Sequence, residues 1–221
     1  MPRYCLWLVG VRPRDLRQCP RVMERIDKVK AFRLASKKEA TKKKAETPYL
    51  FDDGIESKTN YVAIPVTSSE KRSYIPMDWL PSEIIPSADL RIIPDATLYH
   101  FGVLTSRVHM SWMRIVAGRL KSDYRYGNTV VYNTFVWPSP SEKVRVKIER
   151  SAEAVLEARA NHPECSYADL YDDNVMPLDL RKAHNENDAA VCEAYGWSED
   201  LSELDIVARL FVMYNEMKNK V

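Results

Sequence analysis

Residues 106–126 are the part of the chain whose side chains are best suited to binding a charged ligand. Four arginines and one lysine alternate there with aromatic and small polar residues. Guanidinium and ammonium groups bind phosphates and the edge of guanine, while Ser and Asn contact phosphates or bases. The pattern favours a polyanion that also presents flat, hydrogen-bonding edges. In the alternative, Met110, Trp112 and Met113 are core residues and the arginines form a solvated face.

Other groups of reactive side chains are less persuasive. Asp52, Asp53, Glu56 and Lys58 can in principle hold Mg²⁺ and activate water, but their tight spacing provides no acidic ligand from a separate strand and favours a polar turn. The four histidines form no His-Glu-x-x-His or i, i+4 pair, the four cysteines form no Cys-x-x-Cys pair, and no two glycines are close enough for a nucleotide-binding loop. We therefore expect a binding module without a metal or cofactor site, rather than an enzyme.

Charge is distributed unevenly along the 221 residues, although the formal net charge is only +2. Residues 1–47 contain 14 basic and 5 acidic side chains, residues 48–140 contain 9 of each, and residues 141–221 contain 10 and 17. This asymmetry fits a leading segment that lies near a polyanion, or alternatively a solvated helix face rich in lysine. Scattered cysteines, no signal peptide and short apolar runs indicate a soluble, cytoplasmic protein without a membrane partner.

The elements that position these side chains can be read from hydrophobic periodicity. The apolar run at residues 4–9 predicts a buried strand. Apolar residues at three-to-four spacing from Arg21 predict an amphipathic helix that ends before Pro48. Strand-like segments at 61–66, 90–93 and 129–135 alternate with polar turns. A helix of about three turns, with Ser106 as its N-cap and an end near Gly118, interrupts them.

The remainder of the chain is expected to be helical. Ser141 can cap a long helix that His162-Pro163 ends, Asn187 is expected to cap a short helix closed by Gly196, and residues 204–217 form a last amphipathic helix. The predicted fold class is α+β: a mixed or antiparallel sheet domain with a basic leading helix, followed by an all-helical C-terminal domain. The expected divisions are residues 1–47, 48–140 and 141–221.

Two sequence motifs resemble the target recognition domain of the MmeI-like family. They are Gly-Arg-Leu-Lys-Ser-Asp-Tyr-Arg-Tyr at 118–126 and Val-Tyr-Asn-Thr-Phe-Val-Trp-Pro at 131–138. Shorter stretches at 4–8, 68–76 and within 170–196 agree, so that the resemblance covers nearly the whole chain in family order. Val136 departs from the family pattern, which usually has a second proline there, and this concerns the stiffness of the loop.

The resemblance implies a function in DNA modification. Members of the family are large single-chain proteins in which an adenine-N6 DNA methyltransferase, often fused to a restriction nuclease, shares one DNA-reading domain. The cofactor loop, the catalytic Asn-Pro-Pro-Tyr turn and the nuclease belong to parts of the family that are not matched here. The resemblance thus implies double-stranded DNA and a methyltransferase domain of the same polypeptide as partners, with S-adenosylmethionine, and Mg²⁺ if a nuclease is present, bound outside this chain.

The same resemblance assigns base-reading positions to Lys121, Asp123 and Arg125, assisted by the segment that contains Asp89. The chemistry agrees, since a lysine donates to guanine O6 and N7 and a carboxylate accepts from the N4 amine of the paired cytosine. In an extended loop, residues 121, 123 and 125 project to the same side, and Arg125 can grip a second guanine. The alternative for Lys121 and Asp123 is a local surface ion pair.

Phosphate contacts are expected from three further arginines, because helix arginines near a duplex usually position the protein. These are Arg107, Arg114 and Arg119. Aromatic residues after the recognition segment are expected to pack around a closing strand, with Asn133 fixing a turn. Two other functions stay open: a protein-interaction or regulatory domain that docks its basic helix, residues 21–44, on an acidic partner, and an autonomous nuclease at Asp53 and Glu56.

Overall fold

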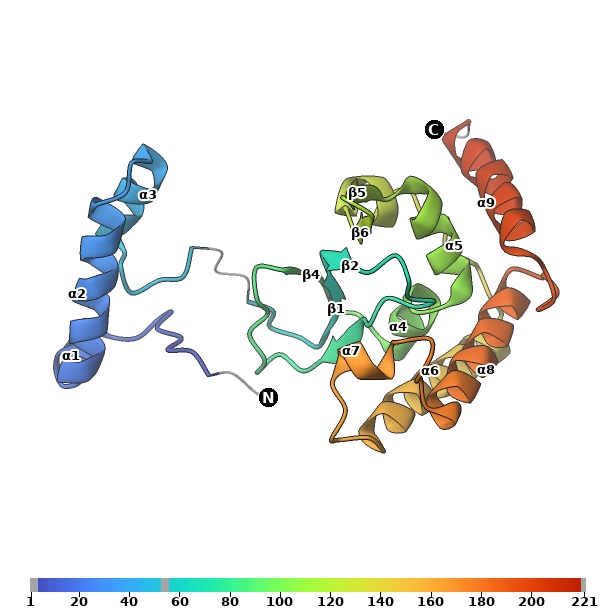
Figure 1. Ribbon diagram of the computed structural model, residues 1–221, viewed down its shortest axis with the longest axis horizontal. Helices are drawn as coiled ribbons and strands as arrows, with labels where there is room; N and C mark the ends of the chain where they lie inside the picture. Colours follow the sequence, from blue (N-terminus) through green and yellow to red (C-terminus); the bar gives the residue numbers. More distant parts are fainter. Residues whose placement is uncertain (1–3, 53–55, 220–221) are drawn as a thin grey trace. The chain divides into compact units, whose positions relative to one another are not determined.

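A computed structural model describes residues 4–52 and 56–219. The chain forms two compact units, Met1–Ile55 and Glu56–Val221, which are described separately below (Figure 1).

The first unit consists of short helices around one longer helix. They are α1 (Pro13–Arg17), α2 (Pro20–Leu34), α3 (Glu39–Lys43) and the single turn η1 (Lys44–Glu46). Proline begins both α1 and α2, where its missing N–H needs no partner. The single helix predicted from Arg21 does end before Pro48, but it is broken after Leu34, where the Ser36 hydroxyl accepts the N–H of Lys38 at 3.1 Å.

The predicted strand at residues 4–9 is wrong. Residues 4–8 belong to no strand or helix, and Tyr4 is 93% exposed. A short apolar run predicts burial without saying what buries it. Here the run lies beside α2, and Trp7 stacks on Phe51 with ring centroids 5.6 Å apart.

The second unit contains two small antiparallel sheets. The first has strand order β3-β1-β4, formed by β1 (Tyr61–Pro65), β3 (Asp78–Leu80) and β4 (Leu90–Pro94). The second has strand order β2-β6-β5, formed by β2 (Thr67–Ser68), β5 (Gly118–Leu120) and β6 (Asp123–Arg125). The strands predicted at 61–66 and 90–93 are confirmed.

Val66, between β1 and β2, joins the two sheets through its main chain. Its N–H donates to the carbonyl of Asp89 at 2.9 Å, and its carbonyl accepts the N–H of Tyr126 at 2.8 Å. These bonds continue the pairing of Pro65 with Leu90 on one side and of Thr67 with Arg125 on the other. The end of β6 and the start of β4 are therefore held on opposite sides of one residue.

Two helices follow β4 and precede β5 in the sequence. They are α4 (Leu98–Leu104) and α5 (Arg107–Val116). The side chain of Ser106 accepts the N–H of His109 and caps α5, as predicted, and Gly118 begins β5 directly after the helix. Trp112, Met110 and Met113 are buried, so this part of the alternative interpretation of the segment is confirmed.

The strand predicted at residues 129–135 is also wrong. Asn128–Tyr132 form the helical turn η2, closed by a hydrogen bond of 2.8 Å from the N–H of Asn133 to the carbonyl of Asn128. Val131 and Phe135, four residues apart, are buried, whereas Val130 is 52% exposed. Packing of one helical side into the core thus prevails over the strand preference of the β-branched residues. Asn133 ends this turn, and Phe135 and Trp137 pack around it.

The final third is helical, as predicted. It contains α6 (Glu142–Ala160), α7 (Tyr167–Leu170), α8 (Leu178–Ala194) and α9 (Glu203–Lys218). Ser141 precedes α6, and Gly196, with φ +70°, follows α8. Asn187 is not a cap: it is buried in the middle of α8 and donates to the carbonyl of Gly102 at 2.8 Å.

One hydrophobic core unites the sheets and the helices of the second unit. Buried side chains of β1, α4, α5, α6, α8 and α9 belong to it, and Trp112 of α5 packs on Phe211 of α9 with ring centroids 5.0 Å apart. The α+β class followed by a helical region is therefore confirmed. None of the helices in the described ranges is long and apolar enough to cross a bilayer.

Candidate nucleic-acid interface

The segment expected to read bases is a β-hairpin. β5 and β6 pair with Leu120 opposite Asp123, so that Lys121 and Ser122 form a two-residue turn at its tip. Lys121 has φ +57°, the left-handed conformation common in such tight turns. The expectation of a continuous extended loop is therefore wrong at Lys121, although it holds for Asp123 and Arg125 in β6.

Alternation along β6 separates the anchoring residues from the presented residues. Tyr124 and Tyr126 are buried, whereas Asp123 is half-buried and Arg125 is exposed. The hydroxyl of Tyr126 lies 3.1 Å from Nε2 of His109, inside the core. Burial lowers the pKa of His109 to about 3, so that its ring is neutral and contributes no charge to this anchor. The core thereby fixes the side of β6 opposite to Asp123 and Arg125.

Arg119 braces the hairpin across its two strands. Its guanidinium lies 4.0 Å from the ring centroid of Tyr124 and donates to the carbonyl of Ser122 at 2.9 Å. A carboxylate oxygen of Glu70 is 3.9 Å away. A cation stacked on an aromatic ring and bonded to the turn carbonyl restricts the position of the tip.

The presented side chains are not used inside the fold. Lys121, Asp123 and Arg125 make no side-chain hydrogen bond or ion pair with any other residue in the described ranges. The local Lys121–Asp123 ion pair that was the alternative is not formed. Among the described residues, nothing competes with a ligand for the donor groups of Lys121 and Arg125 or for the carboxylate of Asp123 on this hairpin.

Asp89 lies close to this hairpin through the Val66 junction. It is exposed and immediately precedes β4, and its carbonyl is bonded to Val66, which is in turn bonded to Tyr126 next to Arg125. Two strand spacings amount to about 10 Å, within the width of a few base pairs. The structure therefore places the Asp89 segment beside the hairpin.

The guanidinium of Arg107 is occupied inside the chain. Its two terminal nitrogens donate to the carbonyls of Glu199 at 2.7 Å and Leu201 at 2.6 Å, in the loop that precedes α9. These bonds satisfy main-chain acceptors that have no helical partner. We therefore leave Arg107 out of the proposed interface.

Arg114 is occupied in the same way. Its guanidinium donates to a carboxylate oxygen of Glu203 at 3.0 Å and to the carbonyl of Ser73 at 2.9 Å. It connects α9 with the chain between β2 and β3, and this position suits a structural role better than a phosphate contact. Of the three arginines expected to contact phosphate, only Arg119 borders the hairpin surface.

Sequence reasoning gave no role to Lys71 and Arg72, which follow β2. β2 pairs with β6, so these two cations lie beside the hairpin although they are about 50 residues away in sequence. The signal that could have identified them is a basic pair within a stretch rich in serine, directly after a strand-like segment.

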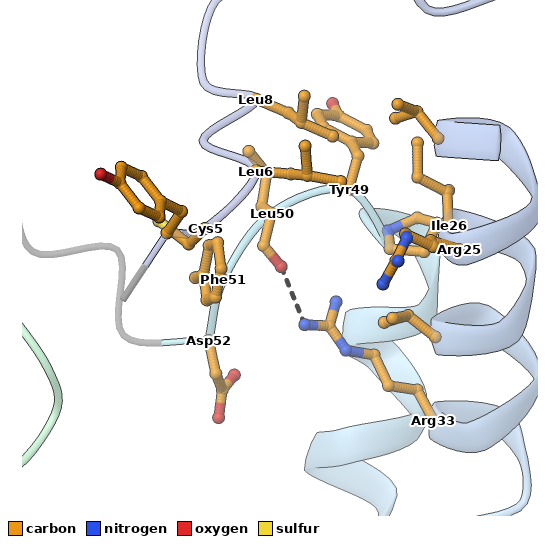
Figure 2. A pocket seen from close by; sticks show the side chains of 14 residues that line it. Cys5, Leu6, Leu8, Arg25, Ile26, Arg33, Tyr49, Leu50, Phe51 and Asp52 are labelled. Carbon is orange, nitrogen blue, oxygen red and sulfur yellow. Dashed lines mark hydrogen bonds between the residues drawn. The ribbon is translucent and has the colours of Figure 1, made fainter. Parts of the chain in front are cut away.

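An apolar pocket of about 850 Å³ lies within the first unit (Figure 2). Figure 2 shows Leu6 and Leu8 facing Ile26 of α2, with Arg33 donating to the carbonyl of Leu50 at 2.8 Å. Arg33 also binds the carbonyls of Lys44 and Thr47, which fastens the end of the unit to α2. The charged side chains in the lining are Arg25, Arg33 and Asp52.

No group of three His, Cys, Asp or Glu side chains within the described residues is arranged to hold a metal ion. Asp52 forms an ion pair with Lys44, and Asp53 of the nuclease hypothesis lies outside the described residues.

The fold and the hairpin together define a class: an α+β recognition domain supported by a helical C-terminal region. Family models confirm it, because the model described as "MmeI, target recognition domain" matches residues 1–139 and "MmeI, C-terminal domain" matches residues 140–221. The chain belongs to the MmeI family.

Two known proteins are similar to nearly the whole chain. DNA methyltransferase A of Bacillus subtilis (strain 168) is 38% identical over 219 residues, which are 99% of this chain and 25% of that protein. The solved structure of the type IIL restriction-modification enzyme MmeI in complex with DNA matches 97% of this chain with a TM-score of 0.91 and 43% identity, and the match covers 29% of that chain. This chain thus spans less than a third of each.

Proposed function

We propose that this chain reads a specific sequence in double-stranded DNA on behalf of an adenine-N6 DNA methyltransferase. The observation that carries the proposal is the β5–β6 hairpin, which presents Lys121, Asp123 and Arg125 on a base of buried tyrosines. Among the described residues, none forms a side-chain bond with these three. The similarity to a restriction-modification enzyme solved with DNA supports it.

Lys121 and Asp123 are assigned to one G·C pair. The ammonium group donates to O6 and N7 of guanine, and the carboxylate accepts from N4 of the paired cytosine. Lys121 lies in the turn, and Asp123 begins β6 directly after it, so both reach the major groove from the hairpin tip. Reading both bases of a pair gives about 1–3 kcal/mol of discrimination for each good contact.

Arg125 and Asp89 extend the reading surface beyond that pair. Arg125 projects from the same side of β6 as Asp123 and is assigned to a second guanine, which a guanidinium grips with two parallel bonds. Asp89 accepts from a base amine at a neighbouring position. Arg119 is assigned to a phosphate at the edge of the hairpin, in addition to bracing the turn.

The chemical step belongs to a methyltransferase domain elsewhere in the same polypeptide. That domain binds S-adenosylmethionine, and a nuclease domain, where one is present, binds Mg²⁺. The size of the two relatives supports this proposal, because the matched part is only 25% and 29% of their lengths. The chain alone is expected to transfer no labelled methyl group to DNA.

A salt titration of duplex binding tests the proposed function. Affinity should fall with a slope of about −0.9 per phosphate contact as counterions are released. Arg119→Ala should reduce the slope by about one contact and weaken binding to all duplexes alike. Arg119→Lys keeps the positive charge, so it should keep the salt slope.

Binding of an acidic protein through the basic helix α2, with no salt-dependent affinity for duplex DNA, would instead favour the protein-interaction function. In that case Arg119→Ala would change nothing.

A further inference from the structure

The turn at residues 69–72 leaves β2 directly beside the reading hairpin. Ser68, the last residue of β2, is paired with Tyr124 of β6. The carbonyl of Ser69 accepts the N–H of Arg72 at 3.3 Å, and its hydroxyl accepts the N–H of Lys71 at 3.3 Å. The turn is thus closed by its own hydrogen bonds and does not depend on a ligand for its shape.

The turn carries two positive charges, on Lys71 and Arg72, that pair with no carboxylate among the described residues. Lys71 is exposed and makes no side-chain bond within the described ranges, while Arg72 donates only to the hydroxyl of Ser68 at 3.4 Å. The acidic residue of the turn, Glu70, lies 3.9 Å from Arg119 and is offset by it. Because Ser68 pairs with Tyr124 and Glu70 lies 3.9 Å from Arg119, the turn that carries Lys71 and Arg72 lies beside the hairpin.

Three contacts hold the residue that follows the turn. The carbonyl of Ser73 accepts from Arg114 at 2.9 Å, its N–H donates to Asp173 at 3.2 Å, and its hydroxyl donates to the same carboxylate at 2.7 Å. The next residue, Tyr74, donates to buried Asp188 at 2.6 Å. In Figure 1 the chain after β2 runs toward α5, in keeping with the bond from Arg114.

We propose that Lys71 and Arg72 bind phosphates of the DNA duplex beside the bases that the hairpin reads. This inference rests on the proposed function and adds a backbone contact that fixes the register of the hairpin on the duplex. Arg114 and Asp173 are positioning residues: they act on DNA through Ser73.

The experiment measures duplex affinity of the full chain as a function of salt, with two unrelated duplex sequences. Lys71→Ala and Arg72→Ala should each make the slope less steep by about 0.9 and weaken both duplexes equally. Lys182→Ala is the matched control, since Lys182 is 78% exposed on α8, and it should leave the slope unchanged. Ser73→Ala removes the hydroxyl bond to Asp173 and no charge, so it should lower affinity at an unchanged slope.

The outcomes separate the two proposals. If the wild type binds duplex DNA with a steep salt dependence and Lys71→Ala and Arg72→Ala retain its slope, the turn does not contact phosphate and this inference is overturned, while the proposed function stands. If the wild type shows no salt-dependent duplex binding, the proposed function fails and the inference with it. Circular dichroism of each variant confirms that a lost slope is not lost folding.

Discussion

Asp188 of α8 accepts the main-chain N–H of Arg107, the first residue of α5, at 2.7 Å. The same carboxylate accepts the hydroxyl of Tyr74 at 2.6 Å. A carboxylate at the first turn of a helix satisfies an N–H that has no helical partner and is favoured by the helix dipole. The C-terminal helices thus hold both the helix that leads into the hairpin and the chain that follows β2.

Arg107→Ala should destabilise the fold rather than weaken phosphate binding. The substitution leaves the carbonyls of Glu199 and Leu201 without their charged donor, and we expect a loss of about 1–3 kcal/mol in the free energy of unfolding. Urea denaturation measures the loss. Arg125→Ala is the control and should leave stability unchanged, because Arg125 is exposed and forms no side-chain bond within the part of the chain that the structure describes. A stable Arg107→Ala variant with a reduced salt slope for DNA would return Arg107 to the interface.

Gly102 is required by the close approach of α4 to α6. A Cβ at this position would lie 2.7 Å from Cγ2 of Ile148 and 3.0 Å from Oδ1 of Asn187. We expect Gly102→Ala to cost about 1–3 kcal/mol by overpacking. Ile148→Ala should cost less free energy of unfolding in the Gly102→Ala variant than in the wild type, because the new methyl group at residue 102 fills part of the cavity that Ile148→Ala leaves. Equal costs in the two backgrounds would show that the helices do not meet at Gly102.

Acidification should destabilise the fold through buried neutral histidine. The pKa of His109 falls to about 3 because of burial, against about 6.5 in an unfolded chain, so the unfolded state binds more protons between these values. From pH 7 to pH 5 this should remove about 2 kcal/mol of stability. Burial also lowers the pKa of His184, which adds to the loss. Burial raises the pKa of Asp188 to about 6. Below that pH the folded state binds a proton at this carboxyl more readily than the unfolded state does, so this group stabilises the fold on acidification and offsets part of the loss.

Two variants isolate the contribution of His109. His109→Gln should lose about 2 kcal/mol less than the wild type between pH 7 and pH 5, since glutamine does not titrate. Tyr126→Phe removes the hydroxyl beside the ring but keeps the buried histidine, so its pH dependence should match that of the wild type. Denaturation midpoints at the two pH values compare them, and an identical pH dependence in His109→Gln would assign the acid sensitivity to other groups.

Periodicity predicted the elements that carry their own signals. Ser106 caps α5, Gly196 follows α8, and residues 61–65 and 90–94 form strands because local sequence and burial agree there. Residues 4–9 and 129–135 were misassigned because composition does not say what an apolar segment packs against. Asn187 was mistaken for a cap because its partner, Gly102, is 85 residues away in sequence.

The same limit applies to the candidate site. The chemistry of Lys121, Asp123 and Arg125 could be stated from residue type and spacing, but the left-handed backbone at Lys121 could not. Arg107 and Arg114 looked equivalent to Arg119 in sequence, and only their distant acceptors, 41 to 94 residues away, distinguish them. Side chains bound inside the fold can be recognised only once the fold is known.

Lys121 and Asp123 together are expected to read one G·C pair. Selection of duplexes from a randomised library, by the wild-type chain and by the double variant Lys121→Glu with Asp123→Arg, tests this assignment. Reversing the order of donor and acceptor should change the preferred pair from G·C to C·G at one position, by tenfold or more, since each contact contributes about 1–3 kcal/mol. Lys121→Ala alone should lose discrimination at that position without redirecting it.

The control for this selection is Lys182→Ala, which should select the same duplexes as the wild type. Every other position of the selected sequence should be unchanged in the double variant. A folded double variant that selects the original pair at every position would show that Lys121 and Asp123 do not contact bases.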